Sequence, residues 1–424
     1  MNKKNKLREF YILWSTQSLS QLGSAITAFA LTLWLYEKTG SALSTAALRI
    51  CTYAPYVIMS IFAGALSDRF DKKKTMLICD LMAALTTVMV FVLYKADMLS
   101  VWHLYLVNAV SGLMNTVQQP ASEVAYTMVI PKEYYQKTSG LQSLSRSLIT
   151  IGNPVIAAAI YGLAGLDAAI VVDLTTFAIA FTALLFFIRI PEIPEKNETE
   201  GSVLRLAKEG LKFLKENRMI LDVILFMAGV NFVASAFDAV LPALIIPNPK
   251  GGNNVLGIVT SCSGIAMVFG SLIVTVMPKP KDRVRVIYLS MLFSLATENY
   301  LLAFSRSPVV WCLSQILGWI FVPVMSANQN VIMRNTIPAK LQGRVYACRN
   351  SLQFFTIPIG LVFGGFMVDK VCEPAMSNAG GILTFAFGSG KGSGAALMMF
   401  VLGVMGTVMC LVFGRRLKKY NYSD

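Results

Sequence analysis

Among the ionisable residues inside or next to long apolar stretches of the sequence are Glu123, Arg146, Asp238 and Glu298. A charged side chain inside a hydrocarbon layer costs about 3 kcal/mol or more unless it pairs, reaches the surface or lines water, so each marks a functional-site hypothesis. Glu123 and Arg146 flank one connecting segment at similar depth, which fits either an ion pair that closes a gate or a carboxyl that exchanges protons. Asp238 and Glu298 lie deeper in their apolar stretches. We predict that these four residues take part in proton coupling.

The composition requires that these residues sit in a membrane protein. Of the 424 residues, 55% are hydrophobic and only 14% are charged. A soluble domain of this length carries about 25% charged residues, so lipid must cover the apolar surface here. The seven cysteines are scattered singly, without the spacing of a metal or redox site. We therefore expect no metal and no cofactor.

The apolar stretches are long enough to span a bilayer, which takes about 20 residues in a helix. Twelve stretches qualify, some of them with one or two ionisable residues inside or at an end: 10–36, 51–67, 75–94, 98–122, 147–166, 168–188, 219–246, 251–278, 286–304, 307–333, 345–368 and 392–414. The predicted fold class is an all-α membrane protein of twelve transmembrane helices.

Lys and Arg residues concentrate in alternate connections, which fixes the predicted orientation. The basic side of the membrane receives the N-terminus, the C-terminus and the polar segment 191–218. The positive-inside rule places that side in the cytoplasm, at the plasma membrane. The asymmetry accounts for the net charge of +14 without any nucleic acid. The predicted domains are a six-helix bundle over 1–190, a cytoplasmic linker with an amphipathic helix over 191–218, and a second six-helix bundle over 219–424.

The two halves share sequence features, which indicates an internal repeat. Ile130-Pro131, followed by Pro154 in the next stretch, recurs as Ile337-Pro338 followed by Pro358. Two parallel six-helix repeats that bind substrate between them near the midplane form one known transporter architecture. We expect Gly152, Pro154 and Pro358 to contribute to close helix packing.

The strongest local motif follows the second stretch and runs from Gly64 through Asp68 and Arg69 to Lys72–Lys74. Gly64 and Asp68 are four residues apart and therefore share one helix face. A carboxylate at the C-terminal end of a helix opposes the helix dipole, so Asp68 is better explained if it meets a partner. An ordinary basic cytoplasmic loop explains the lysines but not the Gly-Asp-Arg spacing.

This segment resembles the signature G-x-L-x-D-R-x-G-R-K of the major facilitator superfamily, with Asp71 in place of the second Gly. Further matches resemble the macrolide-efflux-like branch; they are Lys38-Thr-Gly-Ser41, Met76–Asp80, Pro120-Ala121, Val172–Leu174 and Gly343–Val345. The resemblance covers essentially the whole chain. It implies secondary active efflux of lipophilic drugs such as macrolides, driven by the proton gradient. It also implies that Asp68 locks the cytoplasmic side, with Arg344 or Arg349 as its partner.

The chain departs from the drug–proton antiporter pattern at two places. Asn108 and Gly112 stand where many antiporters carry Arg and Gly, and the fifth-span motif G-P-x-x-G-G survives only as the small residues from Gly152 to Ala158. The chain therefore lacks, at this position, the arginine that the resemblance associates with proton coupling.

The remaining polar residues of the stretches complete the predicted sites. The cytoplasmic gate is expected to comprise Gly64, Asp68, Arg69, Asp80, Arg344 and Arg349. Residues that could line a substrate cavity are Gln17, Gln21, Asn231, Gln315, Asn328 and Gln329, although such groups often bond between helices instead.

The function predicted from these features is proton-coupled export of amphipathic small molecules by alternating access, with macrolide-type drugs first among the substrates. The expected partners are this substrate and the lipid bilayer, with no nucleic acid, and the chain is expected to act as a monomer and not as an enzyme. Export of a siderophore or a lysolipid, nutrient uptake, and a non-transporting receptor on a transporter fold stay open as alternatives.

Overall fold

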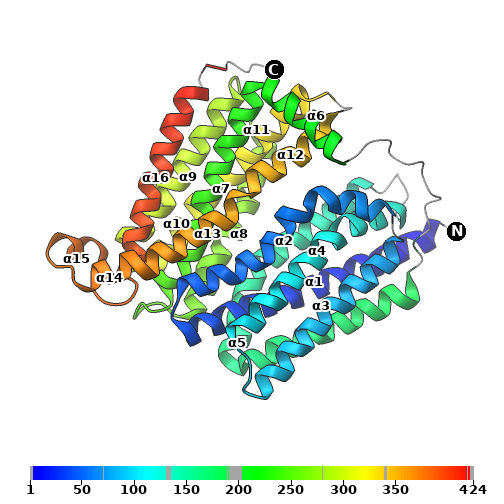
Figure 1. Cartoon of the computed structure of the whole chain (residues 1–424), viewed down its shortest axis with the longest axis horizontal. Helices are drawn as coiled ribbons and strands as arrows, with labels where there is room; N and C mark the ends of the chain where they lie inside the picture. Colours follow the sequence, from blue (N-terminus) through cyan, green and yellow to red (C-terminus); the bar gives the residue numbers. More distant parts are fainter. Residues whose placement is uncertain are drawn as a thin grey trace. The chain divides into compact units, whose positions relative to one another are not determined.

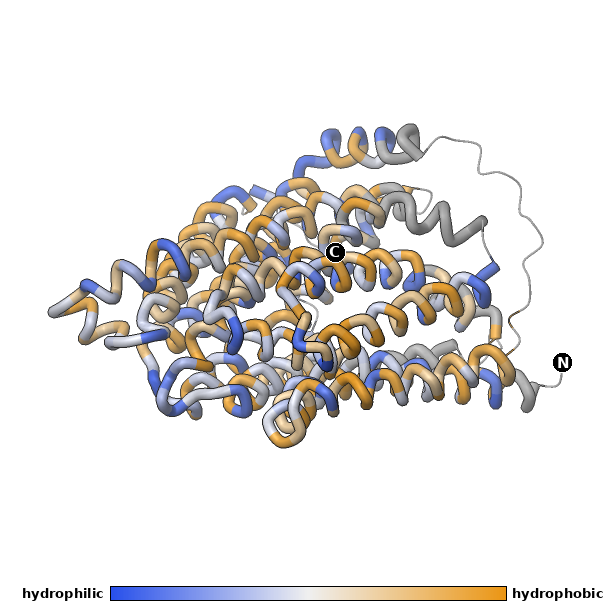
Figure 2. Tube along the Cα trace, turned by 60° about the horizontal axis from the view of Figure 1, so that its bottom comes forward, coloured by the Kyte–Doolittle hydropathy of each residue, from blue (hydrophilic) through white to orange (hydrophobic). Residues whose placement is uncertain are grey.

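Long apolar stretches form helices because a helix satisfies every backbone N–H and C=O group within the segment, as a hydrocarbon environment requires. In a computed structural model the described residues form helices joined by short connections (Figure 1). The structure describes residues 3–69, 71–129, 135–188, 190, 203–278, 280–338, 341–417 and 419–420. Hydrophobic residues dominate these helices, and many hydrophilic residues lie at helix ends and connections (Figure 2). The predicted all-α membrane class is confirmed for this part of the chain.

The chain divides into two compact units. Unit 1 consists of Met1–Leu35 and Cys51–Val203, and unit 2 consists of Tyr36–Ile50 and Leu204–Asp424. The end of the first helix and the first turns of the second therefore belong with unit 2. The domain boundaries proposed from the sequence, at residues 190 and 218, stay a prediction.

Unit 1 is built from five helices, the first two of which it shares with unit 2. They are α1 (Lys3–Thr39), α2 (Ala42–Arg69), α3 (Lys72–Lys95), α4 (Val101–Val129) and α5 (Tyr135–Phe187). Gly165 has φ 74° and ψ −172°, so α5 consists of two helical legs that meet at this residue. The legs correspond to the predicted spans 147–166 and 168–188. Leu13, Met76 and Leu184 are fully buried in a core that joins α1, α3, α4 and the second leg of α5.

Unit 2 contains the remaining helices, with α7 and α9 at its centre. They are α6 (Val203–Glu216), α7 (Arg218–Ile245), α8 (Asn253–Val276), α9 (Arg283–Phe304), α10 (Pro308–Trp319), α11 (Phe321–Thr336), α12 (Gln342–Phe354), α13 (Thr356–Phe366), the π-helix η3 (Met367–Cys372), α14 (Glu373–Ser377), α15 (Ile382–Phe387) and α16 (Ser393–Leu417). Helix α7 packs against α13 and α16, and α9 packs against α10, α11 and α16.

Two predicted spans are interrupted where proline removes a backbone donor. Proline has no N–H and its ring collides with the carbonyl four residues earlier. Pro323 leaves the carbonyl of Trp319 without its helical donor, and α10 ends at Trp319. Pro358 does the same to the carbonyl of Phe354, and α12 ends at Phe354. Each predicted span, 307–333 and 345–368, is therefore a pair of consecutive helices. The predicted packing role of Pro358 stays a prediction; the structure places it at this break.

Nine segments among the described residues are long and apolar enough to cross a membrane. They are Leu7–Thr39, Lys72–Lys95, Ser147–Phe187, Arg218–Ile245, Asn253–Val274, Arg283–Phe304, Pro308–Met333, Cys348–Ser377 and Ser393–Leu417. Ser147–Phe187 includes both legs of α5. Helices α2 and α4 are 28 and 29 residues long but are not among the nine. The count of twelve therefore stays a prediction.

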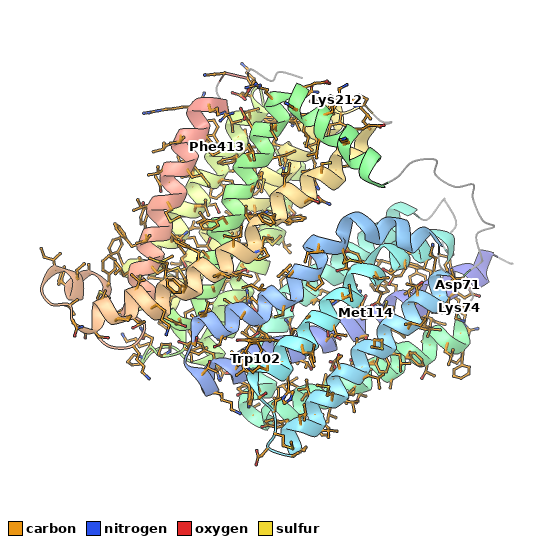
Figure 3. The ribbon with its side chains drawn as sticks, in the orientation of Figure 1. Asp71, Lys74, Trp102, Met114, Lys212 and Phe413 are labelled. Atoms are coloured by element: carbon orange, nitrogen blue, oxygen red, sulfur yellow. The ribbon has the colours of Figure 1, made fainter. Side chains whose placement is uncertain are left out.

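The two units start their corresponding helices in the same way. Asp71 Oδ1 accepts a hydrogen bond of 2.7 Å from the backbone N–H of Lys74 and caps α3 (Figure 3). Asp282 Oδ1 accepts one of 2.9 Å from the N–H of Arg285 and caps α9. An aspartate at this position satisfies one of the unpaired N–H groups of the first turn. Within each unit the acid precedes a basic residue, Lys72 or Arg283, that is buried.

The amphipathic helix predicted between the halves forms α6, which in its coloured part shows hydrophilic residues on one side and hydrophobic residues on the other in Figure 2. Leu214 is buried in a core with Ile220, Met333 and Val345. Lys212, labelled in Figure 3, pairs with Glu216 across an exposed face at 4.0 Å.

Candidate functional site

A buried carboxyl group in unit 2 forms the centre of the best-defined polar site. Glu298 lies on α9 and is 6% exposed. Gln315 Nε2 and Trp319 Nε1 each donate a hydrogen bond of 2.9 Å to its Oε1. These two donors are four residues apart on α10 and so present one face to α9. Gln315 was predicted to line a cavity; in the structure it holds Glu298.

Gly318 lets the carboxyl group approach α10 this closely. A Cβ atom at this position would lie 2.7 Å from Glu298 Oε2 and 2.8 Å from Glu298 Cβ and Cδ. Real Cβ contacts are essentially never that short, so only glycine fits here without movement. The position directly before Trp319 is thus part of the site.

An ion pair lies on the same unit. Arg49 Nη1 of α2 lies 3.3 Å from Asp238 Oδ2 of α7, and the two side chains are 34% and 44% exposed. Pro242, one turn later in α7, removes the N–H that would otherwise donate to the main-chain carbonyl of Asp238.

Arg49 was not among the predicted site residues. The available signal was a lone arginine inside an otherwise uncharged segment, which by itself marks a site in a membrane protein. The sequence could not pair it with Asp238, because the two residues are 189 positions apart and lie on helices whose relative rotation is unknown from periodicity alone.

The arrangement can carry a proton. Asp238 has a cationic partner, whereas the two donors to Glu298 Oε1 are a neutral amide and an indole. A carboxyl held by neutral donors keeps acceptor capacity when it is protonated and gains one O–H donor. The pair therefore combines one acid matched by a fixed cation with a second acid that can change its protonation state without breaking an ion pair.

Unit 1 has two smaller polar sites of the same type. Gln17 of α1 and Gln118 of α4 donate to the two oxygens of Asp80 on α3, at 3.4 Å and 2.5 Å. Ser24 and Thr87 donate to Asp173, at 2.9 Å and 3.3 Å. Each acid thus ties together three helical segments. The gate role predicted for Asp80 stays a prediction, and Gln118 was not predicted.

Three residues predicted to line the cavity make contacts between helices. Asn231 Nδ2 of α7 donates to the carbonyl of Gln353 at 2.9 Å, and Gln329 Nε2 donates to Gln353 Oε1 at 3.5 Å. Asn328 Oδ1 accepts a bond of 3.1 Å from Arg283. Such bonds are the common use of polar side chains within a bundle. A role in substrate contact stays a prediction for all three.

The other predicted site residues are placed less closely or not at all. Arg349 donates to Asn350 and lies over the ring of Tyr346 at 5.1 Å. Gln21 is exposed. Pro154 lies within α5, and the nearest atom that a Cβ at Gly152 would meet is Ile156 Cδ1, at 3.4 Å on the same helix. The predicted residues outside those whose side chains the structure describes are Gly64, Asp68, Arg69, Glu123, Arg146 and Arg344.

Among the described side chains, no group of three or more His, Cys, Asp or Glu residues could hold a metal ion. The acids described above are held by amides, hydroxyls, an indole and a guanidinium. Their contacts are hydrogen bonds and one ion pair.

Comparisons with known proteins place these features in a family. Residues 6–391 match the family model described as transmembrane secretion effector. Macrolide efflux protein A of Streptococcus pyogenes is 26% identical over 376 residues, 88% of this chain and 92% of that protein. The multidrug efflux pump Tap of Mycolicibacterium fortuitum is 25% identical over 365 residues, 82% and 86% of the two chains.

The fold is shared with solved transporters. A bacterial homologue of the human lysosomal transporter Spinster, in an inward-facing occupied conformation, has a TM-score of 0.72 and 13% identity, and the similarity covers 99% of this chain and 98% of that one. At this identity the likeness concerns the fold alone. The relatives are membrane transporters rather than enzymes, with macrolide and multidrug efflux proteins among them. The chain therefore belongs to the transmembrane secretion effector family of major facilitator superfamily transporters.

Proposed function

We propose that this transporter exports amphipathic small molecules, macrolide-type drugs first among them, in exchange for protons. Two sequence relatives are a macrolide efflux protein and a multidrug efflux pump, which supports export and a lipophilic substrate. The proposal also takes the plasma membrane as the site, both termini in the cytoplasm, twelve spans in two six-helix halves, and a monomer without a cofactor.

The observation that carries the coupling proposal is the contrast between the two acids of unit 2. Glu298 is buried and its Oε1 receives bonds from two neutral donors, while Asp238 is matched by Arg49. A proton on Glu298 would remove a buried negative charge, and a proton on Asp238 would release Arg49. Either event changes the balance of charge inside the bundle, which is the requirement for linking proton movement to a conformational change.

Four predicted coupling residues thus enter the proposal with different support. Asp238 and Glu298 are supported by the contacts described above. Glu123 and Arg146 stay candidates from the sequence alone, since their side chains lie outside the described ones.

The experiment is transport of a radiolabelled macrolide into everted membrane vesicles or proteoliposomes, with and without an imposed pH gradient. We expect accumulation to depend on the gradient in the unmodified protein. Glu298→Gln should abolish accumulation driven by the gradient while retaining exchange of labelled for unlabelled drug, because exchange needs no net proton movement. Glu216→Gln, at an exposed acid of α6, is the matched control and should transport normally.

Two outcomes would contradict the proposal. Accumulation that ignores the pH gradient would exclude proton coupling, and normal gradient-driven transport by Glu298→Gln would exclude this residue as its carrier. If no macrolide moves under any condition, macrolides are not the substrate, and transport of siderophores and lysolipids is then measured in the same vesicles.

A further inference from the structure

The segment Tyr36–Ile50 carries a sequence motif to which the proposed function assigns no role. It contains Lys38-Thr-Gly-Ser41, joins α1 to α2, and packs as part of unit 2. Gly40 has φ +62°, a left-handed conformation that glycine adopts without strain and that turns the chain between the two helices. Ser41 follows directly and precedes the first residue of α2.

The N-terminus of α2 is capped by an acid from a distant part of the chain. Ser41 Oγ donates to Asp369 Oδ2 at 2.5 Å, and the backbone N–H groups of Ala42 and Leu43 donate to Oδ1 and Oδ2 at 3.1 Å and 2.9 Å. The first N–H groups of a helix have no partner within the helix, and its dipole favours an anion there. Asp369 therefore makes three charge-assisted bonds to one helix start.

Asp369 stands on η3, the π-helical segment that continues α13. Such segments often occur at functional positions in helices. The next acid, Glu373, caps a different helix, since its Oε1 accepts a bond of 2.9 Å from the N–H of Gly392 beside α16. The two acids of this segment thus serve separate helices, and only Asp369 serves α2.

Below the cap, α2 and α13 meet along a line of regularly spaced residues. A Cβ at Gly365 would lie 2.7 Å from Leu43 Cα, so the two backbones are close together at this point. Ala46 and Leu361 are buried together with Ala239 of α7, and Ile50 and Ile357 pack against them. Residues 357, 361, 365 and 369 are each four apart, so they form one face of α13 and η3. We call this contact of residues 41–50 with residues 357–369 the α2–α13 seam.

Just beyond the seam, α2 lacks one of its backbone hydrogen bonds. Pro55 lies within α2 and removes the N–H that would bond to the carbonyl of Cys51. Cys51 is also the residue at which α2 passes from unit 2 to unit 1. A proline at this point is a common site of helix bending.

We propose that Asp369 is a gating residue of the transport cycle: its cap on α2 is a releasable latch that holds the α2–α13 seam closed. When the bonds from Asp369 break, α2 bends near Cys51 and residues 41–50 move away from α13. The seam lies at the end of α1 and α2 opposite the N-terminus, which the proposed topology places outside the cell. The proposal rests on the alternating access of the proposed function, and it differs from a permanent helix cap, which would support the fold without changing accessibility.

The test measures exposure of the seam in the full-length protein, with the seven native cysteines replaced. Ala46→Cys places a thiol at a position that is 1% exposed. A membrane-impermeant methanethiosulfonate reagent is applied to intact cells and, separately, to everted vesicles. We expect Asp369→Ala to raise the labelling rate from the cell exterior about tenfold or more, because loss of charge-assisted bonds shifts an equilibrium by roughly that factor.

Several variants keep the result interpretable. Ser41→Ala removes one of the three bonds to Asp369 and should raise the labelling rate less than Asp369→Ala does. Gly365→Ala should also raise labelling from the cell exterior, because the added Cβ forces Leu43 away from α13. Asp167→Ala, at an exposed acid paired with Lys95 in unit 1, should leave labelling unchanged. Ala303→Cys, on α9 and 3% exposed, reports unfolding and should stay unreactive in every variant.

Unchanged labelling at position 46 in both Asp369→Ala and Ser41→Ala would overturn the latch, as would a parallel rise at position 303. A rise confined to everted vesicles would place the seam on the other side and overturn its assignment to the exterior. Labelling needs no transport, so a failure of proton coupling leaves this result readable, and a failure of the latch leaves the coupling experiment readable.

Discussion

Gly318→Ala tests whether the contact between α9 and α10 is as close as the structure has it. The new Cβ would lie 2.7 Å from Glu298 Oε2 and 2.8 Å from Glu298 Cβ and Cδ. An ordinary van der Waals contact is about 3.4 Å or more, so the two helices or the carboxyl group must move by roughly 0.6 Å. Since Glu298 Cβ itself is in the way, rotation of the carboxyl group alone cannot relieve the contact.

The cost can be worked out from the groups involved. Overpacking of a well-packed core costs about 1–3 kcal/mol. If the helices separate, the hydrogen bonds from Gln315 and Trp319 weaken as well, at about 1 kcal/mol each. We expect Gly318→Ala to lower the free energy of unfolding by about 2–4 kcal/mol, and to impair gradient-driven transport because Glu298 is displaced.

The measurement is thermal unfolding of purified protein in detergent, followed by intrinsic fluorescence, beside the vesicle transport assay. Gly152→Ala is the matched control, since the nearest described atom to its Cβ would be Ile156 Cδ1, at 3.4 Å. That change should be neutral or stabilising by up to about 1 kcal/mol, because alanine favours a helix over glycine. If Gly318→Ala unfolds and transports like Gly152→Ala, the close contact at Glu298 is wrong.

Two further predictions concern single contacts of unit 2. Trp319→Phe keeps the ring but removes the indole donor to Glu298, so we expect a loss of about 1 kcal/mol in unfolding free energy and a changed pH dependence of transport, measured in the same vesicles. Asp222 is 2% exposed and accepts bonds from Arg416 and Tyr420; Asp222→Ala should destabilise by about 2 kcal/mol, less than the ~3–5 kcal/mol of a fully buried pair because Arg416 is half exposed. Partial burial, the bond to Asp222 and that carboxylate's charge raise the pKa of Tyr420. Its stabilisation is therefore complete below the unfolded pKa of about 10 and is lost as the pH rises further, so Tyr420→Phe should match the parent protein only at strongly alkaline pH, in unfolding measured across pH 7–11.

The helices could be predicted from the sequence because their signal is local. Continuous apolar runs predicted the positions of α3, α7, α9 and α16, and the polar segment 191–218 was predicted to carry an amphipathic helix, which the structure shows as α6. The helix breaks at Trp319 and Phe354 could also have been predicted, because Pro323 and Pro358 stand four residues later. A proline leaves the carbonyl four residues earlier without its helical donor. The turns of α14 and α15 were missed because six or fewer residues carry too little periodicity.

The site could be predicted only in part, because side-chain partners depend on how helices are rotated. Glu298 and Asp238 stood out as charges in apolar runs, but nothing in the sequence indicated which helix would hold Glu298. In the structure it is 6% exposed and held by α10. Arg49 and Asp369 had no local signal for their partners, since an ion pair and a helix cap across distant segments leave no spacing in the sequence.

Arg49 and Asp369 hold opposite ends of the same short stretch of α2, and this allows a test of whether the seam moves as one body. Ala42, bonded to Asp369, and Arg49, paired with Asp238, are about 10 Å apart at 1.5 Å per residue. Sites separated by more than about 7–10 Å usually contribute additively, within about 0.5 kcal/mol. A seam that opens as a unit predicts otherwise: once Asp369→Ala has opened it, Arg49→Leu should add little to the labelling of the thiol introduced at position 46. We expect the double variant to fall short of the product of the two single effects by at least about fivefold, or about 1 kcal/mol. Multiplicative effects would mean that the inner ion pair and the outer cap act independently, and a proton on Asp238 could not then loosen the outer end of α2 through Arg49.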